Sequence, residues 1–110
     1  MKKYYEIAAK WWTDLLRGES ALEASEETLI NFESNLAKEI KCTVEKQGFM
    51  SLFVEIKPDY TLERIAQESG ISVGAFPMRT TMGIKVVKAI AEITVKIGNS
   101  EKKPLKPLSE

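Results

Sequence analysis

Apolar positions in the first half of the chain recur every three or four residues, which is the period of an amphipathic helix. Residues 3–17 carry this pattern and are followed by Gly18, a residue that favours a helix end. Ser25 can cap a second helix running to about Lys46. Two helices are therefore predicted, with apolar stripes formed by Tyr4, Tyr5, Ala8, Trp11, Trp12, Leu15 and Leu16 and by Leu29, Phe32, Leu36, Ile40 and Val44.

After Gly48 the apolar period shortens to two residues, which is typical of a β-strand. One face of this strand is strongly apolar and the other is mixed: the first consists of Met50, Leu52, Val54 and Ile56, the second of Phe49, Ser51, Phe53 and Glu55. Pro58 stops the strand, and either Asp59 or Thr61 can then cap a short helix through Ser69. Gly70 follows, where a left-handed helix end is favoured.

Two more strands are predicted at residues 79–85 and 91–97, and the segment between them, 86–90, fits either a strand connection or a helical turn. The polar, Pro-containing residues 99–110 are expected to be a disordered tail. Residues 1–98 then form a single α+β domain in the order α-α-β-α-β-β, in which the first two helices pack on a small, three-stranded, mainly antiparallel sheet. The expected core residues are Leu29, Phe32, Leu36, Ile40, Leu52, Val54, Ile56, Ile93, Val95 and Ile97.

The stretch TLERIAQESGISVGAFP, residues 61–77, begins like a helix-turn-helix, with a helix, a Gly and a new start near Ser72. A second helix from Ser72 would meet Pro77 within about two turns, and proline in a helix interior costs about 3 kcal/mol. The residues after Pro77 favour a strand over a helix that could lie in a major groove. A DNA-binding regulator using a degenerate motif at 61–76 is therefore the alternative to the main hypothesis below.

Composition narrows the chemistry further. The 110 residues include 16 basic and 16 acidic side chains, and this zero net charge argues against general binding to nucleic acid. The chain has no His, which removes the commonest general base and most zinc sites. Cys42 stands alone in the sequence, which suits a reducing cytoplasm. We therefore expect a cytoplasmic protein without catalysis, cofactor or metal, and no segment is apolar for long enough to span a membrane.

Trp11 and Trp12 are the first candidates for a partner surface, because Trp and Tyr are favoured as anchors in interfaces. Adjacent helical positions point about 100° apart, so one indole should pack inward and the other should lie at an edge. Tyr5, beside them in the sequence, belongs to the same candidate surface. Ordinary core and rim packing is the alternative explanation of these rings, and it needs no partner.

A second candidate surface is acidic. Residues 18–37 contain five acids and no Lys or Arg, whereas residues 79–106 contain seven bases and two acids. Such a patch could occupy a basic groove on a nucleic-acid-binding enzyme, but acids at a helix start also favour the helix dipole without any partner. The acidic residues are Glu19, Glu23, Glu26, Glu27 and Glu33, of which Glu23, Glu26 and Glu27 are the candidate contacts.

Two blocks, YYEIAAKWWTDLLRG (Tyr4–Gly18) and GISVGAFPMRTTMGI (Gly70–Ile84), resemble a set of small uncharacterised proteins of Gram-positive phages and mobile elements. Met78 and Gly83 stand where those proteins usually have Trp. The resemblance implies a habitat more than a mechanism. By analogy with small mobile-element proteins that block host proteins, anti-CRISPR proteins among them, the main hypothesis is a non-enzymatic protein-binding module that inhibits a host or phage protein.

Overall fold

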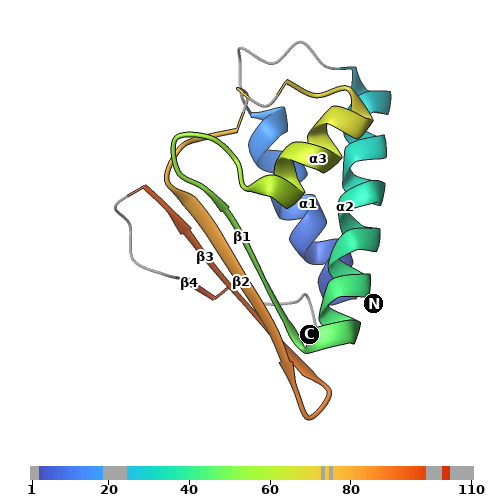
Figure 1. Ribbon diagram of the computed structural model, residues 1–110, viewed down its shortest axis with the longest axis vertical. Coiled ribbons are helices and arrows are strands. Elements are labelled where there is room, and N and C mark those ends of the chain that lie inside the picture. Colours follow the sequence, from blue (N-terminus) through green and yellow to red (C-terminus); the bar gives the residue numbers. More distant parts are fainter. Residues whose placement is uncertain (1–2, 19–24, 73, 75, 99–102, 105–110) are drawn as a thin grey trace.

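Three helices and an antiparallel sheet form two layers, with the helices on one face of the sheet (Figure 1). The computed structural model describes residues 3–18, 25–72, 74, 76–98 and 103–104. The elements follow one another as α1 (Tyr4–Arg17), α2 (Glu26–Gln47), β1 (Phe49–Val54), α3 (Tyr60–Ser69), β2 (Thr80–Val87), β3 (Ile90–Ile97) and the two-residue β4 (Lys103–Pro104). The predicted α+β class and the order α-α-β-α-β-β are confirmed.

The helix ends lie where the sequence predicts them. The Ser25 hydroxyl accepts the backbone N–H of Thr28 at 3.1 Å and caps α2. Gly48 ends that helix in the left-handed conformation, with φ 85°. Of the two candidate caps for α3, Asp59 is the one used: its carboxylate accepts the N–H of Leu62 at 2.8 Å.

The sheet has the order β1-β2-β3-β4, with every neighbouring pair antiparallel. The segment 86–90 is a strand connection and not a helical turn, because Val87 pairs with Ile90 across a two-residue loop. Lys88 and Ala89 both have positive φ, 52° and 66°, as a type I′ hairpin turn requires. Lys103–Pro104 pair with β3 inside the segment 99–110 that was expected to be a disordered tail, and the other residues of that segment lie outside the described part of the chain.

The core lies between the helices and the sheet. Most predicted core residues are buried there, and Val95 packs against the core while partly buried. The confirmed members are Leu29, Phe32, Leu36, Ile40, Leu52, Val54 and Ile93. The helix face of α3 contributes Leu62, Ile65 and Ala66.

Two predicted core residues are not buried. Ile56 is 87% exposed, because β1 ends at Val54 and the chain bends so that Val54 bridges Pro58. The alternation of the strand therefore stops before it reaches Ile56. Ile97 is 44% exposed at the last position of β3, whereas Ile93 in the same strand is 2% exposed. Burial along β3 decreases as the twisted sheet leaves the cover of the helices.

No α-helix follows Gly70 among the described residues before β2. Instead, Phe76 turns into the core and contacts the rings of Trp12 and Phe32, at centroid distances of 6.1 and 5.9 Å. The Thr80 hydroxyl donates to the carbonyl of Pro77 at 3.0 Å and helps to shape the bend into β2. The described part of the motif at 61–76 thus contains its first helix and lacks a second one.

Candidate functional site

The two adjacent tryptophans divide between core and edge. Trp12 is fully buried, whereas Trp11 is half-buried and packs edge-on against it, with 5.2 Å between the ring centroids. The expected division of the pair is confirmed, and Trp12 is the inward member. Since its ring is inaccessible, Trp12 does not contribute to a binding surface in this conformation.

Tyr5 and Trp11 remain as partly exposed rings on α1. The Lys41 ammonium lies 5.6 Å from the centre of the Tyr5 ring, within the range of a cation–π contact. Tyr5 also lines a shallow groove of about 630 Å³ along α1 and α2. The other lining residues mix both charges with few apolar groups: Glu6, Ile30, Glu33, Ser34, Ala37, Lys38 and Lys41.

Of the acidic side chains considered as partner contacts, only some are exposed and without an ion pair among the described residues. Glu26 forms an ion pair with Arg17 at 2.7 Å, although no base is near it in the sequence. The end of α1 lies next to the start of α2, and this packing supplies the cation. Hydrogen bonding to Glu26 raises the pKa of Arg17. Glu27 is exposed, while Glu23 and Glu19 lie outside the described residues.

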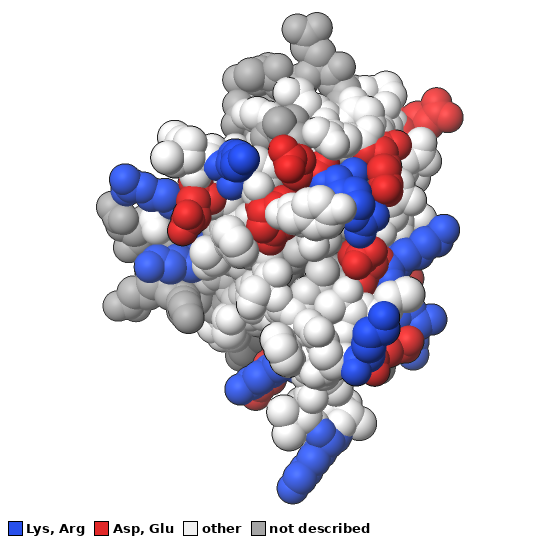
Figure 2. All heavy atoms as spheres, in the orientation of Figure 1, with Lys and Arg blue, Asp and Glu red and all other residues white. Residues whose placement is uncertain are grey.

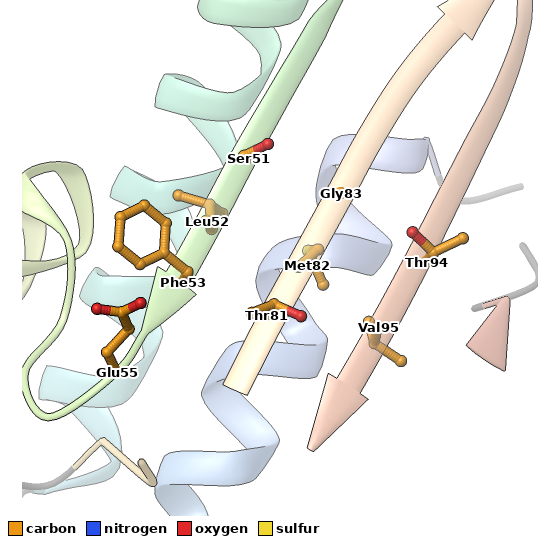
Figure 3. Close-up of a pocket in the computed structure, with 9 residues that line it drawn as sticks. All are labelled: Ser51, Leu52, Phe53, Glu55, Thr81, Met82, Gly83, Thr94 and Val95. Carbon is orange, nitrogen blue, oxygen red and sulfur yellow. The ribbon is translucent and has the colours of Figure 1, made fainter. Parts of the chain in front are cut away.

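The sheet face opposite the helices holds a shallow hollow of about 350 Å³ (Figure 3). Its centre is Gly83, which pairs with Ser51 on β1 and Thr94 on β3. A side chain at position 83 would meet the Thr94 hydroxyl, because a Cβ there would lie 3.3 Å from that oxygen. Figure 3 shows the Thr94 hydroxyl turned toward β2. Glycine thus leaves a floor of small polar groups in the middle of the open face.

Large apolar side chains gather next to this hollow, at the end of the sheet where β2 begins. Phe53 pairs with Thr81, which in turn pairs with Lys96, so these three form one row across the open face. A second hollow of about 520 Å³ adjoins this row and is lined by Ile56 and Met78, among others. Glu55 and Thr81 line both hollows.

We call this region the sheet-end surface and define it as Phe53, Glu55, Ile56, Met78, Arg79, Thr81 and Lys96. Three of its apolar side chains are well exposed: Ile56 by 87%, Met78 by 62% and Phe53 by 42%. Sequence reasoning missed it, because Ile56 fits the pattern of a core residue. The available signal was Phe53, an aromatic residue on the mixed face of the strand.

The backbone holds Arg79 in an unusual conformation at this surface. Its φ of 59° is in the left-handed region, which costs a residue with a Cβ about 1–2 kcal/mol. The Arg79 N–H donates to the carbonyl of Glu55 at 3.2 Å, and its carbonyl accepts the N–H of Gly98 at 2.8 Å. These bonds tie the bend before β2 to the ends of β1 and β3, and so fix the side chains around both hollows.

Charges elsewhere are interspersed. Figure 2 shows acidic and basic side chains side by side over the helices, while Lys and Arg side chains predominate at the left, near the end of the sheet.

No group of three or more His, Cys, Asp or Glu side chains in the described part of the chain is placed to hold a metal ion. Cys42 is exposed on α2.

The fold and this surface define a class: a small α+β protein whose sheet is covered by helices on one face and carries exposed apolar groups on the other. A scan against protein-family models finds no matching family, and a search of curated proteins finds no match. Within the described residues, none of the helices combines the length and apolarity needed to cross a membrane.

Proposed function

We propose that this chain is a non-enzymatic protein-binding module that contacts its partner through the sheet-end surface. The observation that carries the proposal is the grouping of exposed Phe53, Ile56 and Met78 around two adjoining hollows. Contiguous apolar side chains on a surface mark interaction sites, and aromatic residues and Met are enriched where proteins bind one another. Met is also flexible enough to fit partners of different shape.

The sheet-end surface is a better candidate than the α1–α2 groove. The groove contains the half-buried Tyr5 and exposes one large aliphatic side chain, Ile30, at 56%. The sheet end exposes three large apolar side chains, and its backbone is held by hydrogen bonds between the segments that flank β1, β2 and β3. A fixed apolar surface loses less conformational freedom on binding.

The resemblance of the Tyr4–Gly18 and Gly70–Ile84 blocks to proteins of Gram-positive phages and mobile elements supports a narrower proposal. In it, the chain is encoded by such an element and inhibits a host protein, in the manner of an anti-CRISPR protein. The described residues do not point to one particular host enzyme, so the partner is to be identified by purifying the proteins that bind the chain.

Capture with matched variants tests the proposal. The tagged chain is incubated with a lysate of a Gram-positive host, and bound proteins are quantified for wild type and for Ile56→Thr/Met78→Thr. The control is Val87→Thr/Ile90→Thr, which removes two other exposed apolar groups (55% and 67% exposed) from the far hairpin. We expect one partner to be lost with the first variant and retained with the control.

Two results count against the proposal. Equal capture by both double variants would exclude the sheet-end surface. Loss with Ile30→Thr alone would assign binding to the α1–α2 groove instead. The inhibitor role is tested by adding wild type to the captured partner, whose activity should fall, whereas Ile56→Thr/Met78→Thr should leave that activity unchanged.

A further inference from the structure

The charged side chains of the sheet-end surface define the chemistry of its partner. Arg79 and Lys96 line the larger hollow together with Glu55 as its acidic residue. Among the described residues, neither cation forms an ion pair, whereas Lys85 on the same sheet face is paired with Glu92 at 3.5 Å. The hollow therefore carries an excess of positive charge on a chain whose formal net charge is zero.

The apolar and charged groups are arranged side by side. Ile56 and Met78 line the same hollow as Arg79 and Lys96, so one bound segment can reach both kinds of group. Burial of apolar side chains supplies most of the affinity at such a surface, and charges at its rim direct association and select the partner. A basic segment would meet two cations and one carboxylate there, a local excess of positive charge that disfavours it.

We infer that the sheet-end surface binds an acidic segment of a partner protein, with an apolar side chain of that segment against Ile56 and Met78 and its carboxylates at Arg79 and Lys96. This inference rests on the proposed function and adds the chemical class of the partner. The Arg79 guanidinium can hold a carboxylate with two parallel hydrogen bonds, and the Lys96 ammonium acts as a second point of charge.

The strained backbone at Arg79 supports this assignment. A non-glycine residue with φ of 59° persists where the surrounding structure fixes it, and such residues cluster at binding sites. The conformation is held by hydrogen bonds to Glu55 and Gly98, and both of these residues line the larger hollow. Glycine at this position would relieve the strain but remove the guanidinium.

A titration with synthetic peptides tests the inference. The probe is a short peptide with Leu-Phe flanked by Asp and Glu, and the comparison peptide has Lys in place of every acid. Backbone amide spectra of the whole chain should shift around residues 53–56, 78–81 and 96–98 with the acidic peptide alone. Added salt should weaken this binding, because the contacts are exposed.

Two double variants distinguish an effect of the sheet-end surface on peptide binding from an effect of the chain's net charge. Arg79→Gln/Lys96→Gln should weaken binding of the acidic peptide by roughly fivefold, as expected for two exposed contacts. Lys46→Gln/Lys88→Gln removes the same charge elsewhere, and Lys88 matches Arg79 in having a positive φ of 52°. This control should bind as wild type does. If the substitution of Arg79 disturbs folding, the single variant Lys96→Gln replaces the double variant in this titration.

Several outcomes would overturn the inference: equal binding of both peptides, shifts confined to the α1–α2 groove, or equal losses in the two double variants. Tighter binding of a short DNA duplex than of the acidic peptide would assign the cations to phosphate. If these results appear while Ile56→Thr/Met78→Thr still abolishes capture, the proposed function stands and only the acidic class of partner fails.

Discussion

Neighbouring residues in this chain have different roles because the helix turns about 100° between them. Trp12 points into the core against Phe76, and Trp11 lies at the edge. The indole Nε1 of Trp12 is buried without a hydrogen-bond partner among the described residues, which costs about 1–3 kcal/mol. Its burial must therefore be supported by packing, and its role is structural.

This difference is measurable by substitution. Trp12→Ala should lower the free energy of unfolding by about 3–5 kcal/mol, because it leaves a large cavity in the core. Trp11→Ala should cost about 1–2 kcal/mol, because the ring is already partly exposed. Denaturant unfolding of both variants gives the comparison. Equal losses would show that Trp11 is as deeply packed as Trp12.

Asp59 joins two elements through one carboxylate. One oxygen accepts the N–H of Leu62 and caps α3, and the other accepts the N–H of Phe53 on β1 at 2.9 Å. Burial raises the pKa of Asp59, while hydrogen bonds from Leu62, Phe53 and Thr61 act in the opposite direction. The direction of the net shift implies that desolvation of the carboxylate outweighs these bonds.

The raised pKa of Asp59 predicts a pH dependence of stability. The folded chain holds this proton more tightly than the unfolded chain, whose Asp pKa is about 3.9. The stability that Asp59 contributes is therefore largest at pH values below the pKa of the unfolded chain, and it is lost as pH rises through the raised pKa of the folded chain. In denaturant unfolding experiments, the free energy of unfolding of wild type should therefore fall relative to that of Asp59→Asn as pH rises. A shift in favour of wild type would show that the cap bonds dominate.

At the scale of elements, periodicity and caps predicted most of the fold. Ser25, Gly48 and Gly70 mark helix ends in the sequence, and each lies at an end in the structure. The exposure of Ile56 was not predictable in the same way, because alternation does not reveal that pairing ends at Val54. The turn at Lys88-Ala89 was equally hidden, since neither residue is typical of positive φ.

That turn offers a test of the hairpin. Replacing Lys88-Ala89 by Asn-Gly, the preferred pair for a type I′ turn, should raise the free energy of unfolding by about 1 kcal/mol. The gain is expected because Lys88 and Ala89 occupy left-handed conformations at a steric cost. Denaturant unfolding measures it. A loss of stability would indicate a different turn geometry.

At the scale of the whole molecule, the sheet is one-sided. Helices cover one face, and the open face ends in Phe53, Ile56 and Met78. The candidate surface could not be predicted from the sequence, because it joins residues near 55, 79 and 96 that meet only through strand pairing. The aromatic stripe of α1 was the visible signal, but packing against Phe76 removes Trp12 from the surface.

The most direct test of whether the partner binds at the sheet-end surface is backbone amide hydrogen exchange of the chain, measured with and without its captured partner. Binding at the sheet-end surface should slow exchange in residues 53–56, 78–81 and 96–98, and leave residues 5–11 and 30–41 on the α1–α2 side unchanged. Protection of the α1–α2 side with no change at the sheet end would contradict the proposal and place the partner on the helices.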